Sequence, residues 1–171
     1  KVKSGFTSLQ EGEIFNLLDS VLVKGNWLPL PKDFVKGISL CLFSTSRDFT
    51  QKFLSSICVR GNTIESSDDL RISSYCMEDT ISKPFLLPFN SAKELIGYNI
   101  SDYSIEDSWV HFKLSSGGIF TSRVILEEYP ETKQFLDVEG ISLELPHNLL
   151  NCIEIVSTLS EGDYDLDKKI E

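Results

Sequence analysis

The 171-residue chain has 41% hydrophobic and 25% charged residues, a composition typical of a globular protein that can bury a core. Its formal net charge of −10 at pH 7 argues against a domain that binds nucleic acid with its whole surface, but it leaves room for a local basic patch. No apolar run approaches the roughly 20 residues of a membrane span, and no signal-peptide pattern opens the sequence.

The N-terminal stretch predicts two short strands, over residues 1–6 and 14–18, and a loop that continues to residue 27. It shows no helical pattern, and we interpret it as the end of a preceding domain followed by a linker. Because the sequence opens at Lys1 in the middle of a pattern, we expect the chain to be a piece of a longer protein.

A strand, a helix and three further strands are predicted between residues 28 and 76. An apolar run over residues 28–31 ends at a proline, and a helical pattern covers residues 31–44. Lys32 and Lys36 fall together on the polar face of this helix. Its apolar positions fall on the other face: Phe34, Ile38, Cys41 and Leu42. Strand signals then follow over residues 53–60, 63–67 and 70–76.

The same order recurs after residue 84. A strand over residues 85–88 ends at Pro88, and a helix is predicted over residues 91–98, with Asn90 or Ser91 as its N-cap. A hairpin follows, with strands over residues 109–114 and 119–126 and a turn at residues 115–118.

A third copy of the pattern begins after a connector over residues 131–140. A strand is predicted over residues 141–145, followed by a helix that carries Leu149, Ile153 and Val156 inward. Its polar side chains are expected to face outward: Asn148, Asn151, Glu154 and Ser157. The sequence ends before this copy is complete.

The three copies form an internal repeat. Pro31, Pro88 and Pro146 each end an apolar run and open a helix, at intervals of 57 and 58 residues. Proline suits the first helical turn, where its missing N–H is no loss. The repeat predicts an α+β fold of two pseudo-symmetric β-α-β-β-β units, with two helices on one face of curved antiparallel sheets.

The cysteines contain no C-x-x-C pair, and each lies in an apolar stretch: Cys41, Cys58, Cys76 and Cys152. This pattern favours buried free thiols in a reducing, cytoplasmic compartment, with a disulfide or a metal site as the alternative. A zinc site is not expected, because neither His111 nor His147 has a cysteine or acidic partner at ligand spacing. We expect no metal or other cofactor.

Three motifs carry a resemblance to a known family. Residues 67–72 (Ser-Asp-Asp-Leu-Arg-Ile) are similar to a Thr-Asp-Gly-His-Arg-Leu strand signature, although Asp-Leu replaces its Gly-His pair. Residues 85–88 with Leu95 are similar to a strand and helix that open the second half of a domain, and residues 120–125 with Tyr129-Pro130 to its closing strand and turn. Gln134 stands where a basic residue is common. In order and spacing these segments resemble the sliding clamp of bacterial and phage replicative DNA polymerases, the beta-clamp family.

The resemblance implies a processivity factor and not an enzyme. Residues 1–27 would be the end of the first clamp domain plus a linker, 28–139 the middle domain, and 140–171 the truncated start of the third. The full-length protein would be a ring-forming homo-oligomer that encircles duplex DNA without reading its sequence. Its partners would be a replicative DNA polymerase and a clamp loader, which would bind through short peptide motifs, and it would have no membrane partner.

The resemblance also implies two sites. The partner-peptide groove would be walled by Leu54, Ser67, Arg71, Ile72 and Pro130. The alternatives are core packing for Leu54 and Ile72 and a surface salt bridge for Arg71. The DNA-facing cations would be Lys32, Lys36 and Lys93, and the alternative for them is an ordinary solvated helix face.

Two other classes of function stay open: a small-molecule enzyme domain of repeated α+β architecture, and an adaptor without a DNA role. Asp68-Asp69 could be a catalytic carboxylate pair, but no histidine, lysine or third acid follows at useful spacing. Residues 115–118 (Ser-Ser-Gly-Gly) lack the lysine and following helix of a phosphate-binding loop. The sequence therefore indicates no catalytic residue.

Overall fold

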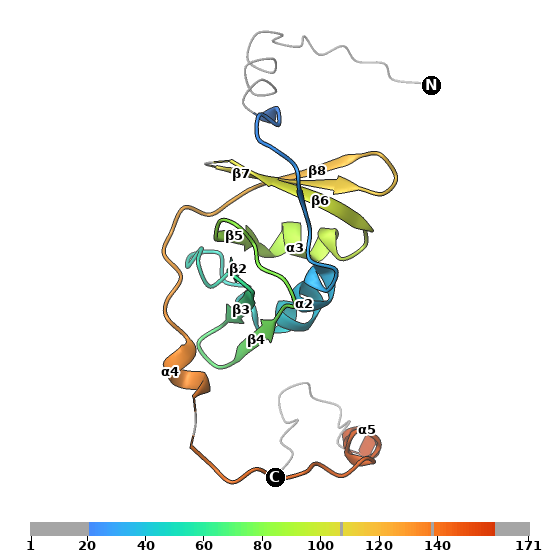
Figure 1. Ribbon diagram of the computed structural model, residues 1–171. Coiled ribbons are helices and arrows are strands. Elements are labelled where there is room, and N and C mark those ends of the chain that lie inside the picture. Colours follow the sequence, from blue (N-terminus) through green and yellow to red (C-terminus); the bar gives the residue numbers. More distant parts are fainter. Residues whose placement is uncertain (1–20, 107, 138, 160–171) are drawn as a thin grey trace, which may run out of the picture. The chain divides into compact units, whose positions relative to one another are not determined.

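The structure is a computed structural model that describes residues 21–106, 108–137 and 139–159 (Figure 1). The strands predicted over residues 1–6 and 14–18 lie outside the described residues. The chain divides into two compact units, of which the first ends at Leu136 and the second begins at Asp137. No helix within the described ranges is long and apolar enough to cross a membrane.

The first unit contains one element order twice: a strand, a helix and three strands. The first copy consists of β1 (Leu28–Pro29), α2 (Phe34–Cys41) with the 3-10 helix η1 (Leu42–Ser44), β2 (Ser56–Arg60), β3 (Thr63–Ser67) and β4 (Ile72–Cys76). The second consists of β5 (Phe85–Pro88), α3 (Phe89–Leu95), β6 (Ile100–Ile105), β7 (Trp109–Leu114) and β8 (Ile119–Arg123). A short helix, α4 (Lys133–Leu136), ends the unit. The repeat predicted from the prolines is confirmed for these two copies.

Each copy gives its first strand to the sheet of the other copy. One antiparallel sheet has the order β1-β6-β7-β8, and the other has the order β4-β3-β2-β5. In the first sheet Leu28 pairs with Tyr103, and in the second Leu86 pairs with Cys58. Neither sheet is therefore complete without residues from both copies.

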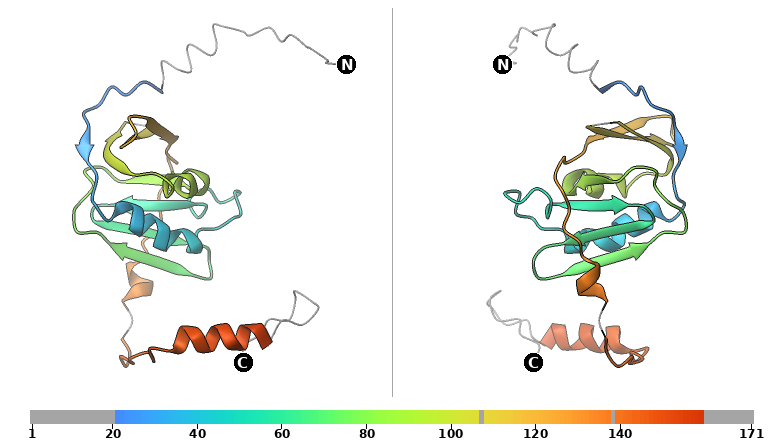
Figure 2. Two further views of the ribbon diagram at one scale, coloured as in Figure 1. Left: turned by 90° about the vertical axis from the view of Figure 1, so that its right-hand side faces the viewer. Right: turned by 60° about the vertical axis from the view of Figure 1, so that its left-hand side comes forward.

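The two helices lie on one face of the unit, as the left view of Figure 2 shows. Helix α2 packs against β3 and β4, and α3 contacts both α2 and β2. Phe34, Ile38 and Cys41 of α2 are buried, while Lys36 on its other side is exposed. This is the predicted α+β arrangement of two pseudo-symmetric units.

One hydrophobic core joins the two copies, and Phe112 lies at its centre. Its ring centroid is 5.8 Å from that of Phe34, 6.5 Å from that of Phe85 and 6.4 Å from that of Phe120. Phe34 comes from the first copy and the other three from the second. Phe112 and Phe34 are both fully buried, so this aromatic cluster holds the copies together.

The structure corrects several details of the sequence prediction. Neither Asn90 nor Ser91 caps α3, because the helix begins at Phe89 directly after β5, with Pro88 at the N-cap position. Strand β2 begins at Ser56, whereas the sequence predicted that this strand would begin three residues earlier, at residue 53. Only two of the four cysteines are buried; Cys76 and Cys152 are exposed.

The second unit contains one helix, α5 (Leu149–Leu159), among its described residues. The strand predicted over residues 141–145 is not formed, because an extended segment needs a neighbouring strand to satisfy its backbone groups. Ile153 and Val156, predicted to face inward, are each 45% exposed. The inward packing predicted for these two side chains is therefore not observed.

Replacing Phe112 by alanine should lower the free energy of unfolding by about 3–5 kcal/mol, because it removes the ring that contacts both copies. Urea denaturation followed by circular dichroism and by tryptophan fluorescence would measure this. Phe135→Ala is the control, since Phe135 is 61% exposed and its loss should change stability by less than about 0.5 kcal/mol. A Phe112→Ala protein as stable as the control would contradict a shared core.

Candidate functional site

Three of the five predicted groove residues lie at one end of the sheet β4-β3-β2-β5. Ser67 at the end of β3 pairs directly with Ile72 at the start of β4. Cys58 of β2 pairs with Glu65 of β3. Extending this register by two residues places Ser56 opposite Ser67, and Leu54 precedes Ser56 by two residues. Hydrogen-bond register thus places Leu54, Ser67 and Ile72 at the same sheet end.

Ser67 and Ile72 face away from the helices. Ser66, their neighbour on β3, points toward α2, because its hydroxyl donates to the carbonyl oxygen of Cys41. Side chains alternate along a strand, so Ser67 points to the opposite face, and Ile72 lies beside it. Leu54 and Ser67 are buried and Ile72 is half-buried, so Ile72 offers the largest apolar surface of the three.

Arg71 is held at the rim by Asp68. The Arg71 side-chain Nε donates to Asp68 Oδ2 at 3.0 Å, its Nη2 bonds the same oxygen, and its backbone N–H donates to Asp68 Oδ1 at 2.9 Å. These bonds hold the pKa of the Asp68 carboxyl below its usual range. The Arg71 guanidinium carbon also lies 5.7 Å from the ring centre of Phe43, so Arg71 reaches from the sheet end toward η1.

The turn that carries this pair needs an unusual backbone conformation. Asp69 has φ of +69°, in the left-handed region that glycine adopts most easily. Position 69 is where the clamp signature has glycine, so the backbone explains that preference. Aspartate is one of the few other residues that tolerate this region.

Pro130 comes from a segment that crosses the same sheet face. The segment joins the sheet where the Ile125 N–H donates to the carbonyl oxygen of Leu86 at 3.1 Å. Further along this segment, the Glu131 Oε2 atom lies 3.5 Å from the Arg60 Nη1 atom of β2. Pro130 is exposed. The predicted groove thus has three residues at the sheet end, Arg71 at its rim and Pro130 on the crossing segment.

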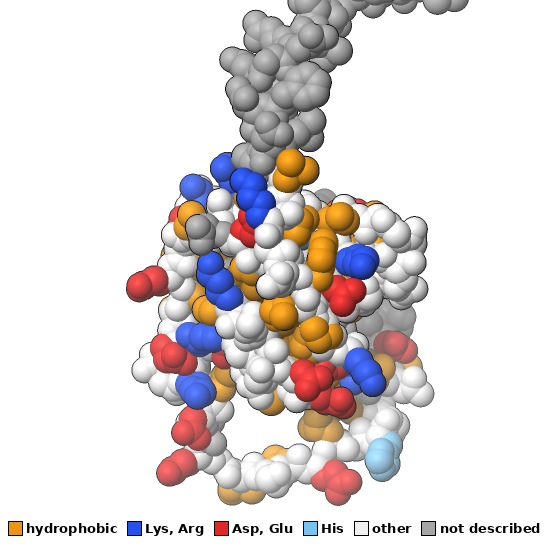
Figure 3. Space-filling model, turned by 45° about the horizontal axis from the view of Figure 1, so that its top comes forward, with side chains coloured by type: hydrophobic (Ala, Val, Ile, Leu, Met, Phe, Trp, Pro, Cys, Tyr) orange, Lys and Arg blue, Asp and Glu red, His pale blue; other side chains and the backbone are white. Residues whose placement is uncertain are grey.

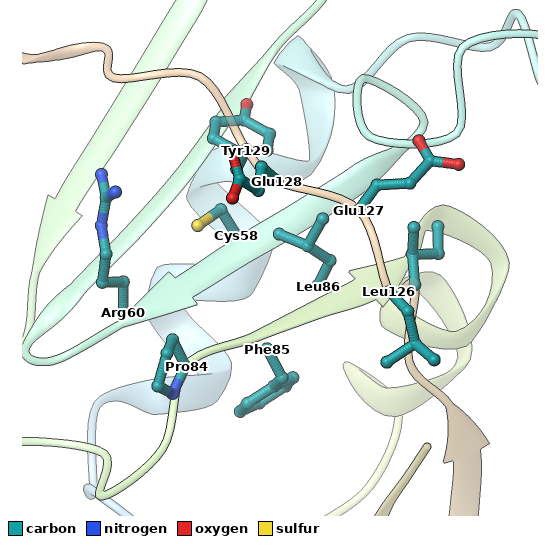
Figure 4. A pocket seen from close by; sticks show the side chains of 10 residues that line it. Cys58, Arg60, Pro84, Phe85, Leu86, Leu126, Glu127, Glu128 and Tyr129 are labelled. Atoms are coloured by element: carbon teal, nitrogen blue, oxygen red, sulfur yellow. The ribbon is translucent and has the colours of Figure 1, made fainter. Parts of the chain in front are cut away.

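Sequence reasoning missed a cavity beneath this crossing segment. It measures about 490 Å³, and none of the five predicted groove residues lines it. Figure 4 shows Cys58 and Leu86 on the two strands below the segment, with Tyr129 beside Cys58 and Arg60 at one end. No sequence motif marks it, because its walls come from strands and a segment far apart in the chain.

This cavity contains no activated nucleophile. Burial raises the pKa of the Cys58 thiol to about 11, so the thiol is protonated near neutral pH and reacts slowly. Burial also raises the pKa of Tyr129 above its ordinary value. Neither Cys58 nor Tyr129 is therefore suited to act as a general base or a nucleophile near neutral pH.

The proposed catalytic and phosphate-binding alternatives have structural explanations. Asp68 accepts hydrogen bonds from Arg71 and from the Leu70 backbone, which is the behaviour of a turn residue. Residues 115–118 form the hairpin turn between β7 and β8, where the Leu114 N–H donates to the Gly118 carbonyl oxygen at 2.9 Å. Within the described ranges, no group of three His, Cys, Asp or Glu side chains could hold a metal ion.

The predicted DNA-facing lysines are exposed on the helix side. Lys32 lies in the turn before α2, Lys36 lies on α2, and Lys93 lies in the last turn of α3. The ammonium nitrogen of Lys36 is 5.8 Å from the ring centre of Tyr75 on β4. On the face of the protein seen in Figure 3, basic side chains are interspersed with acidic and hydrophobic ones and form no continuous basic patch.

Substituting Asp69 tests whether its backbone is constrained. Asp69→Val should lower the free energy of unfolding by about 1–2 kcal/mol, because a β-branched residue resists positive φ, whereas Asp69→Gly should not destabilise the protein. Thermal and urea denaturation would measure both. Asp79→Val is the control, as Asp79 is also exposed but has no positive φ. Equal effects at the two positions would contradict a constraint at Asp69.

No protein-family model matches the sequence, and no curated protein matches it. Solved structures do resemble this one. A protein of Eubacterium rectale assigned as a DNA polymerase III beta subunit matches with a TM-score of 0.65 and 20% identity, over 83% of this chain and 43% of its own. The beta subunit of DNA polymerase from Streptococcus pyogenes matches with a TM-score of 0.57 and 20% identity, over 69% of this chain and 35% of its own.

The Helicobacter pylori beta clamp, solved with a DNA ligase peptide bound, matches with a TM-score of 0.55 and 14% identity, over 71% of this chain and 38% of its own. The chain thus spans less than half the length of each of these structures. The resemblance inferred from residues 67–72 and the later motifs is confirmed for the fold: the chain has the fold of the DNA polymerase III beta subunit sliding clamps.

Proposed function

We propose that this chain acts as part of a sliding clamp, a processivity factor that encircles duplex DNA and tethers a polymerase to it. The observation that carries the proposal is the fold: two copies of one unit with both helices on one face, as in the clamp structures that the chain resembles. Such a protein works in the cytoplasm as a ring-forming homo-oligomer and catalyses no reaction itself.

The sheet end around Ile72 is the proposed docking site for partner peptides. Ile72 supplies a half-buried apolar edge, Arg71 a charged rim, and Pro130 an exposed apolar residue on the crossing segment. An extended peptide with aliphatic and aromatic anchors needs this combination of apolar wall and polar rim. The peptide bound to the Helicobacter pylori clamp gives a precedent for a short partner segment. The proposed partners are a replicative polymerase and a clamp loader.

The helix side is the proposed DNA side. Lys32, Lys36 and Lys93 are exposed there, and each could contact a phosphate without reading sequence. The acidic balance of the whole chain would discourage DNA from binding elsewhere. Partner peptides and DNA would therefore meet opposite faces of the same unit.

Arg71→Ala should weaken the binding of a polymerase-derived peptide by about fivefold to tenfold, because it removes a charged group from the rim of the proposed groove. The Arg71 side chain is 54% exposed, so the melting temperature should change little. An NMR titration of the chain with the peptide measures the affinity and should shift signals near Leu54, Ser67 and Ile72.

The matched control is Arg123→Ala. Arg123 is also exposed, and its guanidinium carbon lies 5.3 Å from the ring centre of Trp109, so the two arginines have similar surroundings on different sheets. The control should bind peptide as the unmodified chain does. Peptide-induced shifts confined to another surface, or equal losses in both variants, would reject the groove assignment.

A further inference from the structure

A hollow on the helix side combines aromatic rings with positive charge. It measures about 440 Å³ and lies between η1 and α3, where it is lined by Phe43, Phe49, Phe89, Arg47 and Lys93 among others. Neither the proposed peptide groove nor the cavity beneath the crossing segment shares these lining residues. No sequence pattern indicated it, because Phe43 is not among the apolar positions of the helix predicted over residues 31–44 and Phe49 lies in no predicted element.

Two of the three aromatic side chains that line the hollow are open to solvent. Phe43 is 63% exposed and Phe49 is 58% exposed, although both are large apolar groups. Exposed phenyl rings that line one hollow leave apolar surface in water, which is typical of a surface that receives a ligand. The Arg71 guanidinium already lies over the Phe43 ring, so Phe49 is the ring proposed here for stacking.

The charge of the hollow is positive in a chain that is acidic overall. Arg47 and Lys93 line it, and no acidic side chain does so within the described residues. Asp48, the neighbour of Arg47, is occupied in its own loop, where its Oδ1 accepts the Thr50 N–H at 2.9 Å. This hydrogen bond lowers the pKa of the Asp48 carboxyl and keeps it ionised within the turn.

The loop that carries Arg47 and Phe49 is structured. The Ser46 hydroxyl oxygen accepts the Asp48 N–H at 3.1 Å, and the Ser46 N–H donates to the Leu54 carbonyl oxygen at 2.9 Å. These bonds close the loop at both ends, so Arg47 and Phe49 are held in place beside α3. Preorganised aromatic and cationic groups reduce the entropy lost when a ligand binds.

We propose that this hollow binds an unpaired nucleotide of single-stranded DNA. The base would stack on Phe49, and Arg47 and Lys93 would contact the phosphates on either side. Proteins use this combination to bind single strands without reading their sequence. The inference rests on the proposed function only in taking the helix side as the side that meets DNA. The occupant would be the single-stranded stretch next to a primer–template duplex.

The test compares a single strand of about twelve thymidines with a duplex of the same length by fluorescence anisotropy at low salt. Phe49→Ala should weaken single-strand binding by about tenfold, because stacking on one ring is lost, and should change duplex binding by less than about twofold. Phe49→Leu keeps apolar area without a flat aromatic face and should behave like Phe49→Ala. Arg47→Gln should weaken the binding of both the single strand and the duplex.

Two controls come from α4: Phe135→Ala, at a ring 61% exposed, and Lys133→Gln, at an exposed cation outside the hollow. Both should bind the strand as the unmodified chain does. Single-strand binding that survives Phe49→Ala, or that Phe49→Leu fully preserves, would overturn the proposal. So would an acidic aromatic peptide that binds the hollow more tightly than the strand does. Phe49→Ala should leave peptide binding at Arg71 unchanged, so this inference can fail while the clamp proposal stands.

Discussion

The exchange of first strands between the two copies is the constraint on which the rest of the structure depends. Strand β1 completes the sheet of the second copy, and β5 completes the sheet of the first. Because each sheet borrows a strand, the segments that follow β1 and β5 are fixed at the junction, and these segments are the two helices. The exchange therefore places α2 and α3 against each other on one face, and it brings Phe34, Phe85 and Phe112 into a common cluster between the copies.

The same constraint separates two surfaces with different chemistry. Side chains alternate between the two faces along β3. Ser66 therefore hydrogen-bonds to α2, while the next residue, Ser67, faces away from the helices. Exposed lysines and the aromatic hollow lie on the helix side, and the Ile72 end of the sheet lies on the other. Arg71 is the exception, since it begins β4 but reaches Phe43 of η1.

The repeat and most of the strands could be predicted from the sequence because prolines and alternation mark them locally. Strand β6 could not: its register shifts between Ile100 and Asp102, which breaks the alternation that identifies a strand. The exchange of first strands could not be predicted either, because β1 has only two residues and no local sequence signal indicates which strand it pairs with. The motif at residues 67–72 predicted the place of the proposed groove, and Asp69 adopts a positive φ at the position where that motif has glycine. The hollow at Phe49 depends on three-dimensional placement alone, so no sequence pattern could reveal it.

The most direct test of the clamp proposal is topological and uses the complete natural protein that contains this sequence. A ring held on DNA by topology resists high salt on a closed circle, whereas lysine–phosphate contacts are lost as salt rises. The measurement is the fraction of protein that stays on a nicked circular plasmid in high salt, before and after the plasmid is cut once. The account predicts retention on the circle and rapid loss from the cut DNA. Loss from both forms at high salt, or equal retention on both, would contradict it.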